Sequence, residues 1–355
     1  MTSPSQATSV SGSDHSSPFL KESFGPQLRE LTDRSREPIP AETLMRASFA
    51  TAVKRESGVT LYNLPGQEIR LTPPSRPLKV AFLTSIRDVG VCESVGKFTA
   101  YGKNRSYIKG TLETALEAVN DERLGKFAEI VAVITDDLKK DLKWSDYVAD
   151  PKLSGRWITP RDARNQKGER ISSITVNIPS NFRALPLNDH EARHARKLQF
   201  ESEVYRVMVE SGADILLSDH FLARIDFLIS PKHFGLLGKV LNTHPGITRA
   251  DHPYATVGKL PYDLMRLHAK GLKQLPDNTV VKVTPCDIAG ASFHLVTAGI
   301  DRGPVLCDGE LTKISPNDTD VEVARKLYET SKYHVFIEGL RHYASNIYPL
   351  MLGIE

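Results

Sequence analysis

The chain alternates between short, almost wholly apolar runs and longer polar stretches, and the apolar runs predict strands buried on both faces of a sheet. These runs cover residues 78–85, 129–136, 213–218, 238–242, 280–284 and 291–296, with a shorter one at 174–178. Helical patterns separate the early runs, and a strand, helix, strand order gives a right-handed crossover between parallel strands. The pattern therefore predicts an α/β fold with an open, doubly wound, mostly parallel sheet.

Helices are predicted where apolar residues recur every three or four positions. The clearest covers about residues 189–211, with Gly212 placed to end it, and others cover about 108–120 and 320–345. In an open sheet of this kind, ligands bind beyond the carboxyl ends of the strands. Polar residues that directly follow a predicted strand are therefore the first candidates for a functional site.

The N-terminal part of the chain differs in texture from the rest. Residues 1–17 are rich in Ser and lack large apolar side chains, which predicts a disordered tail. Residues 18–76 form an N-terminal extension with a helix predicted over 40–53 and a short strand over 58–62. A proline-rich link then leads into the main domain, residues 77–355.

Composition excludes several classes of protein. The 355 residues are 40% hydrophobic and 25% charged, as in an ordinary soluble domain, and 46 basic against 43 acidic residues do not favour nucleic-acid binding. The three cysteines form no CxxC pair, which fits a reducing compartment. The sequence shows no secretory signal and no apolar run near the roughly 20 residues that cross a bilayer. We therefore expect a cytoplasmic protein without a membrane or nucleic-acid partner.

The strongest candidate chemistry follows the strand at 238–242, where Asn242, His244 and Pro245 occur in sequence. Residues two apart in an extended chain point to the same side, so Asn242 and His244 project together from the strand end. Pro245 favours extended geometry at His244. A second polar segment follows the strand at 291–296 and contains Asp301.

An amide, an imidazole and a carboxylate together suit acyl transfer to an incoming amine. The N–H of Asn242 can stabilise the oxyanion that forms when the amine attacks. His244 can donate a further hydrogen bond and transfer protons. Asp301 can orient His244, raise its pKa, or relay a proton through water. No Ser or Cys nucleophile is needed, because the amine attacks directly.

Residues 240–246 and 290–306 resemble the folate-dependent formyltransferase family, which includes glycinamide ribonucleotide, methionyl-tRNA, sugar-amine and hydroxyornithine formyltransferases. Members of this family share an Asn-x-His-Pro strand end and a later His-x-Val-x(4)-Asp-x-Gly-Pro run, which here extends from His294 to Pro304. The resemblance covers about residues 78–350 and implies a Rossmann-like formyltransferase fold.

The same resemblance implies that Asn242, His244 and Asp301 are catalytic, and that 10-formyltetrahydrofolate is the co-substrate, with no metal cofactor. It also implies a folate pocket formed by the loop after the third strand and the loop before Asp301. The pocket residues are predicted to be Leu217, Asp219, His220, Phe221, Leu222, Val296, Thr297, Ala298, Gly299 and Ile300. For His220, a place in an ordinary surface loop is an equally good interpretation.

The loop after the first strand bears on the acceptor. In the ribonucleotide-specific branch of the family it is a short Gly/Ser-rich phosphate cradle, whereas residues 84–109 form a long and irregular segment here. This feature resembles siderophore-type enzymes and favours the side-chain hydroxylamine of delta-N-hydroxyornithine as acceptor. Predicted partners are Arg87, Lys103 or Arg105 for its carboxylate, and Asp88 or Asp219 for its ammonium group.

Other functions remain open at this point. A glycinamide ribonucleotide formyltransferase of purine synthesis and a formyltetrahydrofolate hydrolase need the same three residues, and an inactive binding module would need none of them. Residues 190–194 also fit the HExxH pattern of zinc proteases, with both histidines on one helical face. Their flanks are strongly polar and no further ligand motif follows, so we expect no metal site there.

Overall fold

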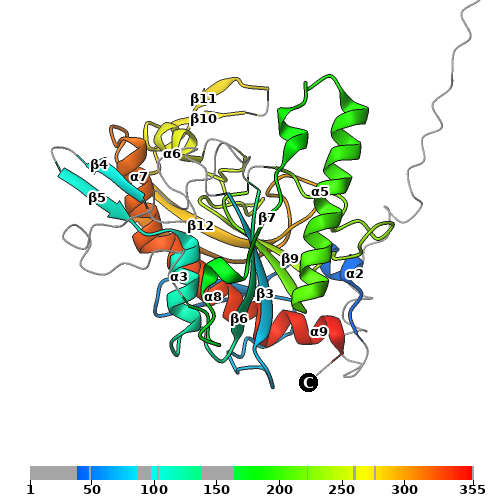
Figure 1. Cartoon of the computed structure of the whole chain (residues 1–355). Helices are drawn as coiled ribbons and strands as arrows, with labels where there is room; N and C mark the ends of the chain where they lie inside the picture. Colours follow the sequence, from blue (N-terminus) through cyan, green and yellow to red (C-terminus); the bar gives the residue numbers. More distant parts are fainter. Residues whose placement is uncertain are drawn as a thin grey trace, which may run out of the picture.

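The computed structural model describes residues 38–47, 49–85, 97–101, 104–136, 164–221, 223–258, 261–275 and 277–353, and for 97–108 it describes backbone only. Within these residues the main sheet has nine strands in the order β1-β2-β13-β12-β9-β8-β3-β6-β7. Figure 1 shows helices on both sides of this sheet. The strands are β1 (Thr51–Lys54), β2 (Thr60–Asn63), β3 (Leu78–Thr84), β6 (Ala128–Thr135), β7 (Thr175–Asn177), β8 (Ile215–Ser218), β9 (Val240–His244), β12 (Ile288–Leu295) and β13 (Val305–Lys313).

The smaller elements surround this sheet. Two antiparallel pairs lie outside it, formed by β4 (Lys97–Tyr101) with β5 (Asn104–Ile108) and by β10 (Leu272–Gln274) with β11 (Val280–Lys282). The described helices are α2 (Ala41–Arg46), α3 (Thr111–Val119), α5 (His190–Ser211), α6 (Pro261–Ala269), α7 (Asp320–Leu327), α8 (Tyr333–His342) and α9 (Tyr348–Leu352), with short 3-10 helices at Ile171–Ser173 and Asn181–Ala184.

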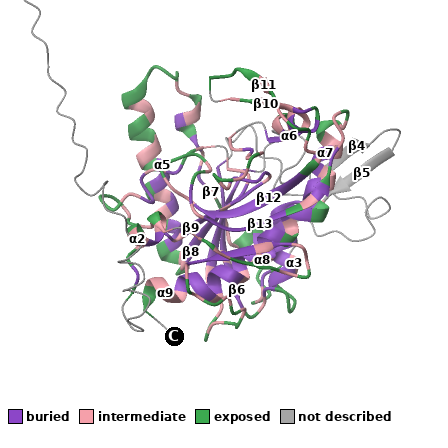
Figure 2. Ribbon diagram, turned by 180° about the vertical axis from the view of Figure 1, so that it is seen from behind, coloured by how far each residue is buried: buried purple, intermediate pink, exposed green. Residues whose placement is uncertain are grey.

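The strands β9, β8, β3, β6 and β7 run parallel, and β12, β13, β2 and β1 extend the sheet with antiparallel pairings. Helices α3 and α8 pack their apolar side chains on one face, and α5 packs on the other. Figure 2 shows the buried residues concentrated in the sheet and on the helix faces turned towards it. The predicted doubly wound α/β fold is confirmed.

Local signals explain the limits of the long helix α5. The side chain of Asp189 accepts a hydrogen bond from the backbone N–H of Ala192 at 3.2 Å and caps the start of the helix. Gly212 ends it in the left-handed conformation, with φ of 67°. Residues between these limits follow the predicted pattern, so the predicted helix is confirmed.

The helix predicted over 40–53 is wrong in its second half. Helix α2 ends at Arg46, and Thr51–Lys54 forms strand β1 instead, paired antiparallel with β2. The β-branched residues Thr51 and Val53 suit a strand, and pairing with β2 supplies the hydrogen bonds that a longer helix would have made. Because β2 in turn pairs with β13, this part of the extension continues the main sheet.

Two other helices differ in detail from the pattern. Helix α3 begins at Thr111, after strand β5, and the side chain of Glu113 accepts the backbone N–H of Gly110. The C-terminal helix continues past residue 345 to Leu352, with π-helical turns at Tyr328–Lys332 and Tyr343–Ile347. Among the described helices, none combines the length and the apolar surface that a membrane-spanning segment requires.

Candidate active site

The carboxyl end of β9 places two of the predicted catalytic residues side by side with β12. Asn242 lies opposite His294, and His244 lies opposite Ser292, in the antiparallel register of the two strands. Alternate residues of a strand share a face, so Asn242, His244, Ser292 and His294 face the same side of the sheet. The site is therefore built on two adjacent rigid strands.

His294 orients the amide of Asn242. Nδ1 of His294 is 3.0 Å from the carbonyl oxygen of Leu295, to which only an N–H can donate, and in this tautomer Nε2 is the acceptor. That Nε2 is 3.1 Å from Nδ2 of Asn242, and the other N–H of this amide points at Oδ1 of Asp301 at 3.4 Å. The longer contact is the weaker one, so it is the N–H that an oxyanion can take over.

His244 is held in one tautomer by the backbone. Its Nε2–H donates to the carbonyl oxygen of Thr256 at 2.8 Å, and its Nδ1 faces Oδ2 of Asp301 at 3.4 Å. Only 6% of His244 is exposed, and burial lowers its pKa more than the charge of Asp301 raises it. Asp301 does act to raise the pKa of His244, as expected, but burial outweighs this effect and the net shift is downward. The ring is neutral at physiological pH, with an open Nδ1 beside a carboxylate.

Asp301 completes this arrangement from the loop between β12 and β13. Its backbone has a φ of 49°, a left-handed conformation that Asp tolerates better than most residues. Oδ2 accepts the backbone N–H of Gly258 at 3.0 Å. Burial opposes ionisation, but His244, His294 and the N–H of Gly258 outweigh it and hold the pKa of Asp301 well below its usual range. Asp301 is therefore an anion that has no proton of its own.

The pair His244 and Asp301 thus forms a site with room for one more proton. Nδ1 of His244 and Oδ2 of Asp301 are 3.4 Å apart, so a proton taken up by Nδ1 lies beside the carboxylate, which stabilises it. A proton released by an attacking nitrogen fills that gap and converts the contact into an ion pair. The arrangement suits the transfer of an acyl group to an N–H nucleophile, with Asn242 as the oxyanion donor.

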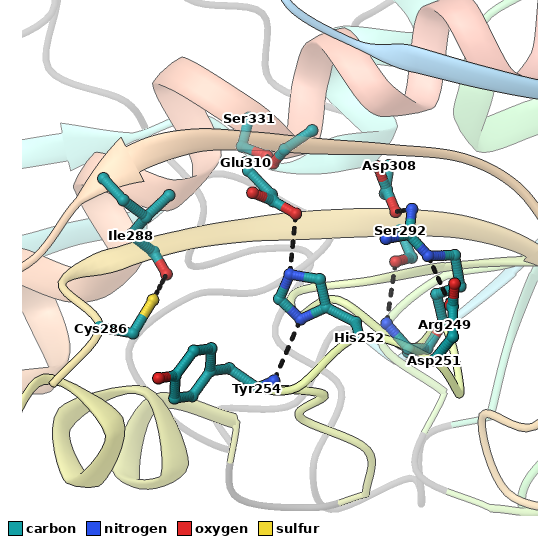
Figure 3. Close-up of polar contacts among 12 residues, drawn as sticks. Arg249, Asp251, His252, Tyr254, Cys286, Ile288, Ser292, Asp308, Glu310 and Ser331 are labelled. Atoms are coloured by element: carbon teal, nitrogen blue, oxygen red, sulfur yellow. Dashed lines mark hydrogen bonds and ion pairs between the residues drawn. The ribbon is translucent and has the colours of Figure 1, made fainter. Parts of the chain in front are cut away.

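The loop after β9, residues 245–258, supplies both backbone groups that hold this pair. A Cβ atom at Gly246 would lie 2.2 Å from Oγ1 and 2.8 Å from the carbonyl oxygen of Thr256, so only glycine allows the loop to pass there. Figure 3 shows this loop crossing β12 and β13, with Arg249 and His252 directed at acidic side chains. The loop backbone is thus part of the site.

Comparison with solved structures identifies the family. PvdF of pyoverdin biosynthesis, an N10-formyltetrahydrofolate-dependent formyltransferase, matches with a TM-score of 0.63 and 31% sequence identity, over 76% of this chain and 100% of that chain. This chain belongs to the folate-dependent formyltransferases. No protein-family model and no curated protein matches it.

More distant structures also match this formyltransferase. A glycinamide ribonucleotide transformylase from Symbiobacterium toebii has a TM-score of 0.42 and 15% identity, over 76% of this chain and 89% of that chain. A formyltetrahydrofolate deformylase from Pseudomonas putida KT2440 has a TM-score of 0.41 and 13% identity, over 89% of each chain.

The residues predicted to bind folate differ in burial and in packing. The side chain of Leu217 lies in the main core, and Phe221 stacks on Phe200 with ring centroids 5.6 Å apart. Ile300, next to Asp301, is 55% exposed. Of the rest, Val296 and Thr297 are half-buried, Ala298 and Gly299 are exposed, and Leu222 lies outside the described residues.

His220 and Asp219 lie where β8 ends. His220 has a φ of 54°, a conformation uncommon outside glycine and frequent at functional loops. Asp219 is fully buried, and its Oδ1 is 2.7 Å from Nζ of Lys332, which is also buried. No local sequence pattern indicates this ion pair, because Lys332 lies on the distant C-terminal helix.

The predicted acceptor residues lie largely outside the described residues. This holds for Arg87, Asp88 and Lys103, whereas Arg105 belongs to the backbone of β5 and its side chain is not described. These assignments stay predictions. The HExxH residues do open helix α5, and His194 packs edge-on against Phe227, with ring centroids 4.9 Å apart. In the described part of the chain, no cluster of three His, Cys, Asp or Glu side chains could hold a metal.

His294 is the functional residue that sequence reasoning missed. It occurs in the family motif, but its role depends on its position opposite Asn242, which only the register of β9 and β12 reveals. A histidine within a buried apolar strand was the available signal, since such a residue needs a polar partner.

Proposed function

We propose that this formyltransferase moves the formyl group of N10-formyltetrahydrofolate to the side-chain hydroxylamine nitrogen of delta-N-hydroxyornithine. The observation that carries the chemistry is the neutral Nδ1 of His244 facing ionised Asp301, next to the amide of Asn242. Support for this acceptor comes from the long first loop and from the 31% identity to PvdF of pyoverdin biosynthesis.

The three residues divide the reaction between them. Asn242 donates its N–H to the formyl oxygen as the acceptor nitrogen attacks the formyl carbon and the oxygen gains charge. His244 accepts the proton that this nitrogen releases, and Asp301 stabilises the resulting imidazolium. His244 then returns the proton to the folate nitrogen as its bond to the formyl carbon breaks. The products are the formylated acceptor and tetrahydrofolate.

A single proton acceptor favours a hydroxylamine over an alkylamine. An alkylamine with a pKa near that of lysine, about 10.4, is an ammonium ion at neutral pH and must lose two protons in total. A hydroxylamine nitrogen is far less basic because of its neighbouring oxygen, so it attacks as the neutral form and releases one. In the described part of the site, we assign this one proton to Nδ1 of His244, which faces Asp301. For binding the ammonium group of the acceptor amino acid, Asp88 is a better candidate than Asp219, because Asp219 is paired with Lys332.

Mass spectrometry with four parallel reactions tests the acceptor. Each contains enzyme and N10-formyltetrahydrofolate, with hydroxyornithine, ornithine, glycinamide ribonucleotide or no acceptor. We expect folate-dependent formylation of hydroxyornithine only. Formylation of the ribonucleotide would assign the enzyme to purine synthesis. Equal formate release in all four reactions would make it a hydrolase.

A further inference from the structure

A row of register partners joins the active site to the N-terminal extension. His244 of β9 lies opposite Ser292 of β12, Ser292 lies opposite Asp308 of β13, and Asp308 lies opposite Thr60 of β2. The row starts at the catalytic histidine and ends on a strand that precedes the main domain. The loop 245–258 crosses the sheet along this row.

Three polar contacts fasten the loop to β12 and β13. The backbone N–H of Thr248 donates to Oγ of Ser292 at 3.0 Å, and Nη1 of Arg249 donates to Oδ2 of Asp308 at 3.0 Å. Further along β13, Nε2 of His252 is 2.7 Å from Oε1 of Glu310 (Figure 3). The side chain of Asp308 is 4% exposed, so its pairing with Arg249 is shielded from solvent in a way that the Glu310 contact is not.

Tyr62 of β2 joins the same ion pair from the extension. Its hydroxyl donates to Oδ1 of Asp308 at 3.0 Å, and Nη1 of Arg249 donates to the hydroxyl oxygen. The guanidinium carbon of Arg249 lies 5.0 Å from the centre of the Tyr62 ring, within the range of a cation–π contact. Tyr62 is 8% exposed, and Nε2 of His342 donates to its backbone oxygen at 2.8 Å, which fixes β2 against α8.

Downstream of Arg249, the loop delivers the two backbone groups on which the catalytic pair depends. The N–H of Thr256 donates to the carbonyl oxygen of Ile247 at 2.8 Å, which closes the loop on itself. The carbonyl oxygen of Thr256 then receives Nε2–H of His244, and the N–H of Gly258 reaches Asp301. A shift of this loop therefore moves both members of the pair.

We propose that Tyr62, Asp308 and Arg249 are positioning residues for formyl transfer, and that strand β2 of the extension completes the active site by clamping the loop 245–258. This inference rests on the proposed function only for its catalytic consequence. The clamp itself is a structural property that can be measured without any substrate.

A matched control lies at the amino ends of the parallel strands. There Tyr348 donates to Oδ1 of Asp214 at 3.4 Å, and Arg76 pairs with the same carboxylate at 2.6 Å. Asp214 precedes β8, at the amino end of the strand, whereas the catalytic residues lie at carboxyl ends. Tyr348→Phe removes the same kind of hydroxyl as Tyr62→Phe without touching the loop.

Hydrogen exchange followed by NMR or mass spectrometry tests the clamp on the full-length chain without ligand. We expect Tyr62→Phe to speed exchange of the Thr256 and Gly258 amides about tenfold or more, and Tyr348→Phe to leave both unchanged. In the formyl-transfer assay, we expect Tyr62→Phe to lower kcat about tenfold with little change in KM. Arg249→Gln, at a half-exposed position, should repeat the exchange result if Tyr62→Phe fails to fold.

The outcomes separate the two proposals. Unchanged exchange at both amides in Tyr62→Phe and Arg249→Gln, or the same acceleration in Tyr348→Phe, would overturn the clamp whatever the substrate. Faster exchange at both amides with no loss of kcat would show a clamp that does not position the catalytic pair, and would overturn the inference. Faster exchange in an enzyme that never formylates hydroxyornithine would leave the clamp standing and remove the proposed acceptor.

Discussion

His294 and Asn242 lie directly opposite each other on β12 and β9, and Nε2 of the histidine is 3.1 Å from Nδ2 of the asparagine. The other ring nitrogen of His294, Nδ1, is hydrogen-bonded to the Leu295 carbonyl, and this hydrogen bond favours the tautomer with the proton on Nδ1. The amide of Asn242 is thereby turned with its nitrogen towards the reaction site, which an isolated asparagine side chain would not guarantee.

This relationship predicts the effect of His294 substitutions. Asn242→Ala removes the oxyanion donor and should lower kcat about 10²–10³-fold. His294→Ala leaves the donor but frees its rotation, so we expect a smaller loss of kcat with KM nearly unchanged. His294→Gln can still accept the amide N–H and should retain more activity than His294→Ala. Steady-state kinetics on the three variants would contradict this role if His294→Ala were fully active.

The pH dependence follows from the burial of His244. The reaction needs this ring neutral and Asp301 ionised, and the pKa of each is below its usual value. We therefore expect kcat/KM to stay level as pH falls from 8 to the ordinary histidine pKa of 6.5, and to decline only below it. A pH–rate profile that declines already above pH 6.5 would show that His244 is not the proton acceptor.

The buried pair Lys332 and Asp219 predicts a strongly coupled effect on stability. Removing one partner leaves a buried charge, so Lys332→Met should lower the free energy of unfolding by about 3–5 kcal/mol. The double variant Lys332→Met/Asp219→Leu should regain most of that loss. Lys326 of α7 pairs with Asp318, which lies just before that helix, in a partly exposed contact that is also 2.7 Å long. Lys326→Met should therefore cost at most about 1 kcal/mol.

Urea denaturation of these variants measures the coupling between the two buried residues. Purely additive effects of Lys332→Met and Asp219→Leu would mean that the pair is not formed in solution.

His342 makes stability fall in acid. It is fully buried, with Nε2–H donating to the Tyr62 carbonyl and Nδ1 accepting from Asn346, and burial lowers its pKa to about 4. Between pH 6.5 and 4, His342 binds a proton in the unfolded chain but not in the folded chain. The stability that this residue contributes above pH 6.5 is therefore lost as pH falls. At pH 5 the loss is on the order of 2 kcal/mol.

Urea titrations at pH 7.5 and pH 5 check this contribution. His342→Gln should be less stable than the native chain at pH 7.5 but should lose about 2 kcal/mol less on acidification. The same pH dependence in both proteins would mean that His342 is already charged in the folded state.

The sequence predicted the parts of the fold that apolar runs encode. Strands β3, β6, β8 and β9 are continuous buried segments, and their pattern is visible without tertiary information. Strand β1 was missed, because three of its four residues are exposed and its pairing with β2 is a tertiary effect. The hairpin β4–β5 is rich in polar residues and gave no strand pattern.

At the candidate active site, the sequence predicted the catalytic side chains but not the groups that hydrogen-bond to them and hold them in place. Asn242, His244 and Asp301 belong to two sequence motifs, and Asp301 lies 3.4 Å from both Nδ2 of Asn242 and Nδ1 of His244. The groups that hold them are the Thr256 carbonyl and the Gly258 N–H. Every residue has such backbone groups, so the amino-acid sequence does not show which ones are used. Tyr62 and Asp308 are 246 positions apart in the chain, so no local pattern joins them.

The most direct test of joint action by the catalytic residues is a single-turnover measurement of formyl transfer from N10-formyltetrahydrofolate to hydroxyornithine. The measurement compares the native enzyme with four variants: Asn242→Ala, His244→Ala, Asp301→Ala and the triple variant. We expect each single variant to lose at least about 10²-fold in rate, and the triple variant to be little slower than the slowest single one, because the residues act as a unit. A native rate in any single variant, or a triple variant whose loss of rate is the product of the single losses, would contradict joint action.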